Sequence, residues 1–133
     1  MNFLAYRFKP GEDLYDALES SVQAAALDAA AIVTVVGSLT CASLRLASQE
    51  SGSLFQGPFE IVSCVGTLSK HGSHIHLSVS DKDGEMLGGH LMPGSLIYTT
   101  AEVVIVDLSV GWCFERKQCQ ESGYLELDPV RLD

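Results

Sequence analysis

Residues 74–92 read HIHLSVSDKDGEMLGGHLM, and this stretch decides the fold. Successive side chains of a strand point to opposite faces. Ile75, Leu77 and Val79 therefore share one face, while His74 and His76 share the other. The central DKDG is typical of a hairpin turn with glycine in the left-handed conformation. The pattern therefore predicts two antiparallel strands, residues 74–80 and 85–92, with one apolar face toward a core.

The turn also predicts how the two strands pair. With a three-residue loop between them, Asp81 pairs with Glu85, and counting back places His76 directly opposite His90. Opposed side chains have Cβ atoms about 4.5–5.5 Å apart. This register brings the imidazoles of His74, His76 and His90 onto one patch, whereas a slip of one residue would turn His90 to the opposite face.

Three imidazoles on one patch form a ligand set for a divalent metal. Zinc binds histidine nitrogen at about 2.0–2.1 Å and is commonly held by three protein ligands with a fourth position open. A nitrogen-rich, carboxylate-poor patch favours zinc, with nickel, copper and iron as alternatives. We predict a metal site at His74, His76 and His90, against the alternative that these are surface histidines of a hairpin. His71 lies in the preceding loop and is a weaker candidate ligand.

The rest of the chain predicts more strands and one helix. Alternating apolar residues up to Phe8 predict a first strand, and helical spacing predicts about four turns of helix after Pro10-Gly11, through Asp28. We expect a doubly buried strand over residues 32–36, a break at Gly37-Ser38, and a polar loop over residues 48–58. Further strands are expected over residues 40–47, 59–68, 97–108 and 112–118. We predict a single α+β domain spanning residues 1–133, mainly antiparallel, with seven or eight strands.

Composition narrows the classes of partner. The 133 residues carry 17 acidic and 8 basic side chains, a formal net charge of −9. Such a surface repels phosphate backbones and anionic lipid, so it favours a metal, a small molecule or a protein as partner. No apolar run reaches the ~18 residues of a membrane helix, and the first residues lack the pattern of a secretory signal. The four cysteines form no C-x-x-C pair, and we expect reduced thiols in a cytoplasmic protein.

Several short segments occur in a characteristic order. They are PGEDL (10–14), GSL (37–39), GPFEIVS (57–63), HIHLSVSD (74–81), GGHL (88–91) and TAEVVI (100–105). Together they resemble the plants-and-prokaryotes-conserved (PPC) domain family over residues 6–127, nearly the whole chain. The resemblance implies a central, mainly antiparallel sheet of about seven strands, one main helix against it, and a homotrimer.

The same resemblance also has implications for the function. Plant members carry an AT-hook, an Arg-Gly-Arg-Pro element that enters the minor groove, and this sequence has none, as in the stand-alone prokaryotic type. Prokaryotic relatives are often labelled predicted DNA-binding proteins, and those with a three-histidine pattern resemble metal-binding trimers. The pattern maps onto His74, His76 and His90. We therefore expect a trimeric zinc-binding, non-enzymatic domain with a small ligand at the metal. A DNA-binding or transcription-associated protein is one alternative, and a metal-dependent hydrolase or lyase is another.

Glu60 and Glu102 interrupt apolar strands. A carboxylate buried there would need a cation or hydrogen-bond donors, and Arg7 and Arg45 are the expected partners. The structural interpretation is an ion pair or a contact at a trimer interface. The functional interpretation is a general base for a metal-dependent reaction.

Overall fold

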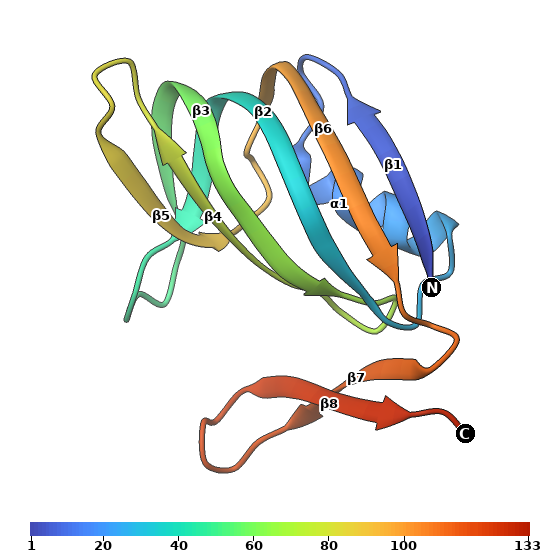
Figure 1. Cartoon of the computed structure of the whole chain (residues 1–133). Coiled ribbons are helices and arrows are strands. Elements are labelled where there is room, and N and C mark those ends of the chain that lie inside the picture. Colours follow the sequence, from blue (N-terminus) through green and yellow to red (C-terminus); the bar gives the residue numbers. More distant parts are fainter.

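The computed structural model describes all of residues 1–133 and contains one helix and eight strands. The elements are β1 (Asn2–Phe8), α1 (Leu14–Ala24), β2 (Ala30–Arg45), β3 (Ser53–Leu68), β4 (His74–Ser80), β5 (Met86–Leu91), β6 (Ile97–Asp107), β7 (Trp112–Gln118) and β8 (Leu125–Arg131). Six strands form one sheet in the order β1-β6-β2-β3-β4-β5, and every pairing is antiparallel. The predicted α+β class is confirmed (Figure 1).

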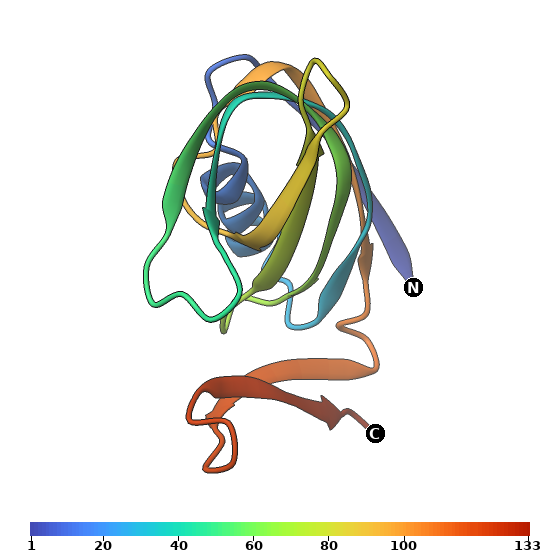
Figure 2. The same ribbon diagram turned by 90° about the vertical axis from the view of Figure 1, so that its left-hand side faces the viewer.

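The sheet curls until its far edge returns to its middle. At the end of β2, Leu44 pairs with Leu91 and Arg45 pairs with His90, so β5 contacts β2 as well as β4. Figure 2 shows the long strands β2 and β3 bending around the side on which α1 lies. This closure brings β2, β4 and β5 together at one end of the sheet.

Glycine permits the long strands to run without interruption. The predicted break at Gly37-Ser38 is wrong, because β2 passes through both residues. A Cβ on Gly37 would lie 2.0 Å from the Thr100 carbonyl oxygen, so only glycine lets β6 approach β2 so closely. The polar loop predicted over residues 48–58 is also too long, since β3 begins at Ser53 and pairs with the end of β2. Tertiary pairing here overrides a composition typical of a loop.

Helix α1 packs on one face of the sheet. Asp13 caps its first turn by accepting a hydrogen bond from the Asp16 N–H at 3.1 Å. Leu14, Leu18 and Val22 are fully buried against the strands. The helix has 11 residues, and no helix in the structure is long and apolar enough to cross a membrane.

The helix is shorter than the sequence predicts, ending at Ala24 instead of Asp28. Ala26 takes a positive φ of 50°, and the Leu27 N–H donates to the Val22 carbonyl at 3.1 Å. This is the Schellman arrangement, which is usually marked by glycine. Because alanine occupies the left-handed position, the sequence carries no signal for the stop.

The outer face of the sheet carries no helix (Figure 1). Residues 32–36 are therefore not doubly buried as predicted, and the side chains of Val33 and Val36 are 53% and 57% exposed. Strands β7 and β8 form a separate two-stranded ribbon below the main sheet. The central sheet thus has six strands, where the resemblance implies about seven, and the other two strands form the ribbon.

We expect Gly37→Ala to destabilise the fold by about 1–3 kcal/mol or more, because the added methyl group overlaps the backbone of β6. Gly111→Ala is the matched control, since a Cβ there meets nothing within 4 Å. Urea unfolding followed by circular dichroism measures both. Equal midpoints for the two variants would contradict the close approach of β2 and β6.

Candidate metal centre

The β4–β5 hairpin has the predicted register. His76 lies opposite His90, and Leu77 lies opposite Gly89. The Asp81 N–H donates to the Glu85 carbonyl at 2.9 Å across the turn. The apolar face of β4 is buried in the core, so its histidine face points outward.

Two glycines let β5 fit between its neighbours. A Cβ on Gly88 would lie 2.8 Å from the Leu77 carbonyl oxygen, and a Cβ on Gly89 would lie 2.7 Å from that of Arg45. Close backbone contact therefore explains why glycine occupies both positions next to His90. Because of these two close contacts, β5 packs tightly between β4 and the end of β2.

Strand pairing places the three imidazoles together. The Nε2 atoms of His74 and His76 are 3.0 Å apart. The ring centroid of His90 lies 5.0 Å from that of His74 and 5.8 Å from that of His76. One ring nitrogen from each residue lies within 4.8 Å of the others. Tetrahedral zinc with bonds of about 2.0–2.1 Å needs nitrogen atoms about 3.3 Å apart, so small side-chain rotations complete the geometry.

The surroundings of His74 and His90 disfavour the charged form of each imidazole. Burial lowers the pKa of His90 to about 4, and the positive charge of Arg45 adds to the effect. Burial also lowers the pKa of His74, with smaller contributions from His76 and Arg116. Neutral imidazole is the form that binds metal, because the ligand nitrogen needs its free lone pair. The donor set therefore fits a transition metal such as zinc.

His74 and His90 open onto a cleft of about 900 Å³. Its walls come from the loop after β2, the loop before β4, and the end of the β7–β8 ribbon, and they are mostly polar. The exposed His74 and the half-buried His90 line it together with the half-buried side chains of Arg45 and Arg116. Glu126 also lines the cleft.

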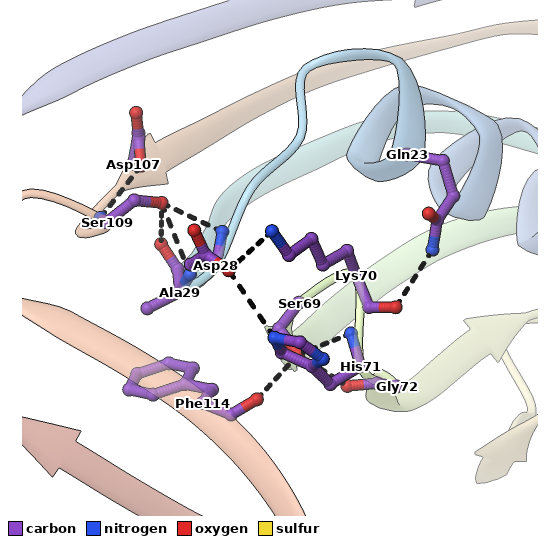
Figure 3. A network of polar contacts seen from close by, with 10 residues as sticks. All are labelled: Gln23, Asp28, Ala29, Ser69, Lys70, His71, Gly72, Asp107, Ser109 and Phe114. Atoms are coloured by element: carbon purple, nitrogen blue, oxygen red, sulfur yellow. Dashed lines mark hydrogen bonds and ion pairs between the residues drawn. The ribbon is translucent and has the colours of Figure 1, made fainter.

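Arg116 is positioned by the docking of the ribbon on the main sheet. In Figure 3, the buried Ser69 hydroxyl donates to the Phe114 carbonyl at 2.7 Å. The Phe114 N–H donates to the Asp28 carbonyl at 2.8 Å. Two residues farther along β7, Arg116 Nη2 donates to Thr67 Oγ1 at 3.0 Å, and Thr67 is the cross-strand partner of His74.

His71 does not join the other histidines. Its Nε2 lies 3.4 Å from Asp28 Oδ1, and the same oxygen is 2.9 Å from Lys70 Nζ (Figure 3). Cys113 completes a second group whose potential ligand atoms lie within 4.8 Å of one another. Because the Lys70 ammonium already neutralises Asp28, an ion pair accounts for this group.

The expected burial of Glu60 and Glu102 and their ion pairs with Arg7 and Arg45 are wrong, whereas a contact at a trimer interface stays a prediction. Both side chains are exposed, and neither forms an ion pair with Arg7 or Arg45. Glu60 pairs with Ser80, four residues along β4 from His76, a distance of about 13 Å at ~3.3 Å per residue. Glu60 is therefore unsuited to act as a general base at the histidines, and Glu102 does not line the cleft beside them.

Sequence reasoning missed Arg116 and Glu126 as residues near the histidines. Both lie on the β7–β8 ribbon, which reaches the site through tertiary contacts. No motif in the sequence marks them, because the ribbon's position depends on hydrogen bonds between segments far apart in the chain.

A family model and curated proteins match most of this chain. The family model of the Plants and Prokaryotes Conserved (PCC) domain matches residues 1–109. A bifunctional protein GlmU from Synechococcus sp. (strain JA-3-3Ab) is 45% identical over 121 residues, covering 91% of this chain but 19% of GlmU. The chain thus spans about a fifth of the length of the curated relatives that it matches.

Solved structures share the fold along nearly the whole chain. A hypothetical protein from Salmonella cholerae-suis (Salmonella enterica) is 44% identical with a TM-score of 0.94, covering 98% of this chain and 94% of that one. A metal-containing protein from Archaeoglobus fulgidus is 28% identical with a TM-score of 0.83, covering 96% and 94%. A Bacteroides thetaiotaomicron protein described as a candidate for DNA binding is 20% identical, with a TM-score of 0.84 and coverage of 96% and 91%, and shows the fold alone.

In the metal-free protein we expect the His90 imidazole to titrate near pH 4, because burial and the Arg45 charge lower its pKa. The unfolded chain takes up this proton near the ordinary pKa of 6.5. The contribution of His90 to stability is therefore fully present above pH 6.5 and is lost as the pH falls toward 4. NMR titration of the ring resonances measures the pKa.

Arg45→Met tests the cause of this shift. Removing the guanidinium should raise the His90 pKa toward its ordinary value without fully restoring it, because burial remains. An ordinary pKa for His90 in the wild-type protein would contradict the described surroundings.

Proposed function

The chain belongs to the Plants and Prokaryotes Conserved (PCC) domain family, and we propose that it is a trimeric domain that holds one divalent metal ion, zinc in the first instance, on His74, His76 and His90. The observation that carries the proposal is the convergence of three imidazoles from two adjacent strands. The similar Archaeoglobus fulgidus protein is described as metal-containing, which supports it.

The proposed role is binding, without catalysis. Zinc on three imidazoles keeps a fourth coordination position for water or a ligand, and it can act there as a Lewis acid. A hydrolase would also need a general acid or base near that position. Glu60 and Glu102 do not line the cleft, and the carboxylates that do are Glu50 and Glu126. We propose a ligand-binding or sensing role because it requires no proton transfer.

Direct DNA binding is the alternative that the family resemblance raises. The formal net charge of −9 opposes it, because affinity for DNA depends on lysine and arginine releasing counterions. A gel-shift series at low salt distinguishes the two proposals, and a shift at micromolar protein would favour DNA binding.

The trimer is proposed from the uncovered face of the sheet. Phe3 on β1, Val36 on β2 and Val65 on β3 are exposed apolar side chains on the face opposite α1. Burying such a face against copies of the same chain removes apolar surface from water, at about 25 cal/mol per Å². The resemblance to the PPC family implies that the occupants are two further copies.

All four cysteines are unpaired, and Cys41 and Cys64 are buried. Free thiols persist in reducing compartments, which supports the proposal of a cytoplasmic protein.

We expect wild-type protein to retain one zinc ion per chain after dialysis, measured by elemental analysis. His76→Ala and His90→Ala should each weaken binding at least about 100-fold, more than the loss of a residue that merely orients a ligand. His71→Ala is the matched control and should bind like the wild type. Equal retention by all four proteins, or none by the wild type, would contradict the site.

Sedimentation should give a mass of about 43 kDa, three times the 14.3 kDa of one chain. Val36→Asp places a charge on the proposed interface and should shift the protein toward monomer. Val110→Asp, at a side chain that is 86% exposed in the β6–β7 loop, should not. A monomeric wild-type protein would overturn the proposal.

A further inference from the structure

We propose that the cleft beside His74, His76 and His90, the histidine triad, is a binding site for a small anion. The carboxylate or phosphate group of this anion is held between Arg45 and Arg116 and reaches the open position of the metal. The contact with the metal rests on the proposed function. The contacts with the two arginines rest on the structure of the cleft alone.

Strand pairing places Arg45 next to the triad. Val65 pairs with His76, His76 with His90, and His90 with Arg45, so the four form one row across β3, β4, β5 and β2. Directly paired residues present their side chains on the same face, with Cβ atoms about 4.5–5.5 Å apart. The Arg45 side chain therefore begins next to His90.

Arg116 approaches from the other side. Its Nη2 is held by Thr67, the cross-strand partner of His74, and its Nε lies 3.5 Å from the Gly72 carbonyl. The ribbon that carries it is anchored by the Ser69–Phe114 hydrogen bond. The two guanidinium groups thus flank the triad at the edge of the same cleft.

Neither guanidinium is neutralised by the protein. None of the ion pairs in the structure involves an arginine, although the chain has 17 acidic residues. Glu50 and Glu126 line the cleft but lie beyond ion-pair distance, and the Ser122 hydroxyl donates to Glu126 Oε1 at 2.9 Å. Half-buried charges without a counter-ion are unfavourable, so this pair of arginines favours an added anion.

A metal ion bound to the triad would further favour an anion in the cleft. Three neutral imidazoles leave the full double positive charge on a bound divalent ion, and the two arginines add two more charges beside it. Arginine forms paired, parallel hydrogen bonds with carboxylate and phosphate oxygens. An oxygen of the same group can replace water at the open zinc position.

The cleft also limits the size and chemistry of the ligand. A volume of about 900 Å³ exceeds a single inorganic ion and suits a small organic molecule. Glu50 and Glu126 can accept hydrogen bonds from hydroxyl or amino groups on the remainder of that molecule. Their charge opposes a long polyanion, so the inferred class is a small polar molecule with one anionic end.

The test uses cobalt-loaded and metal-free full-length protein, titrated with inorganic phosphate and, separately, with malonate. Calorimetry measures affinity, and the visible spectrum of cobalt reports whether the anion reaches the metal. Arg45→Gln and Arg116→Gln should each weaken binding at least about tenfold. Arg7→Gln is the matched control, because Arg7 lies on β1 outside the cleft, and it should bind within about twofold of the wild type.

The outcomes separate this inference from the proposed metal site. Binding of phosphate or malonate that is lost in both cleft variants supports it, and the arm that binds tells a phosphate ligand from a carboxylate one. Cobalt retained without anion binding up to about 10 mM, or binding unchanged in both variants, overturns the anion site and leaves the metal site standing. Failure to retain cobalt overturns the metal contact, while calorimetry on the metal-free protein still decides the role of the arginines.

Discussion

The close packing of β5 between β4 and the end of β2 is the constraint on which the rest of the structure depends. Gly89 allows it, since any larger residue would press its Cβ against the Arg45 carbonyl. The contact closes the curled sheet and fixes the order of side chains across it. The same backbone fit that completes the fold thereby places His76, His90 and Arg45 in one row.

The electrostatics follow from this packing. Burial and the neighbouring Arg45 disfavour the charged form of His90, which keeps its lone pair available to a metal. Arg45 and Arg116 would repel a bare cation, yet they attract an anion that bridges to it. A metal, its three imidazoles and an anionic ligand therefore form one mutually compensating set of charges. Arg45 and Arg116 bring two positive charges without an ion-pair partner into this cleft of an acidic protein.

The parts of the structure that are encoded locally could be predicted from the sequence. The turn after Asp81 determines the hairpin register, and the register alone brings the three histidines together. The uninterrupted path of β2 through Gly37 could not be predicted, because a glycine that permits close approach looks like one that ends a strand. The helix stop at Ala26 carries no glycine, and the position of Arg116 depends on the distant Ser69 and Phe114. The path of β2 and the position of Arg116 depend on contacts between segments far apart in the chain, whereas the helix stop is local but has no glycine to mark it.

X-ray absorption spectroscopy of the zinc-loaded protein tests the central claim most directly, because it reports the ligands of the ion itself. The account predicts three imidazole nitrogens at about 2.0–2.1 Å and one further oxygen. A sulfur neighbour at about 2.3 Å would instead place zinc at Cys113, beside Asp28 and His71, and would contradict the assignment of the metal to His74, His76 and His90.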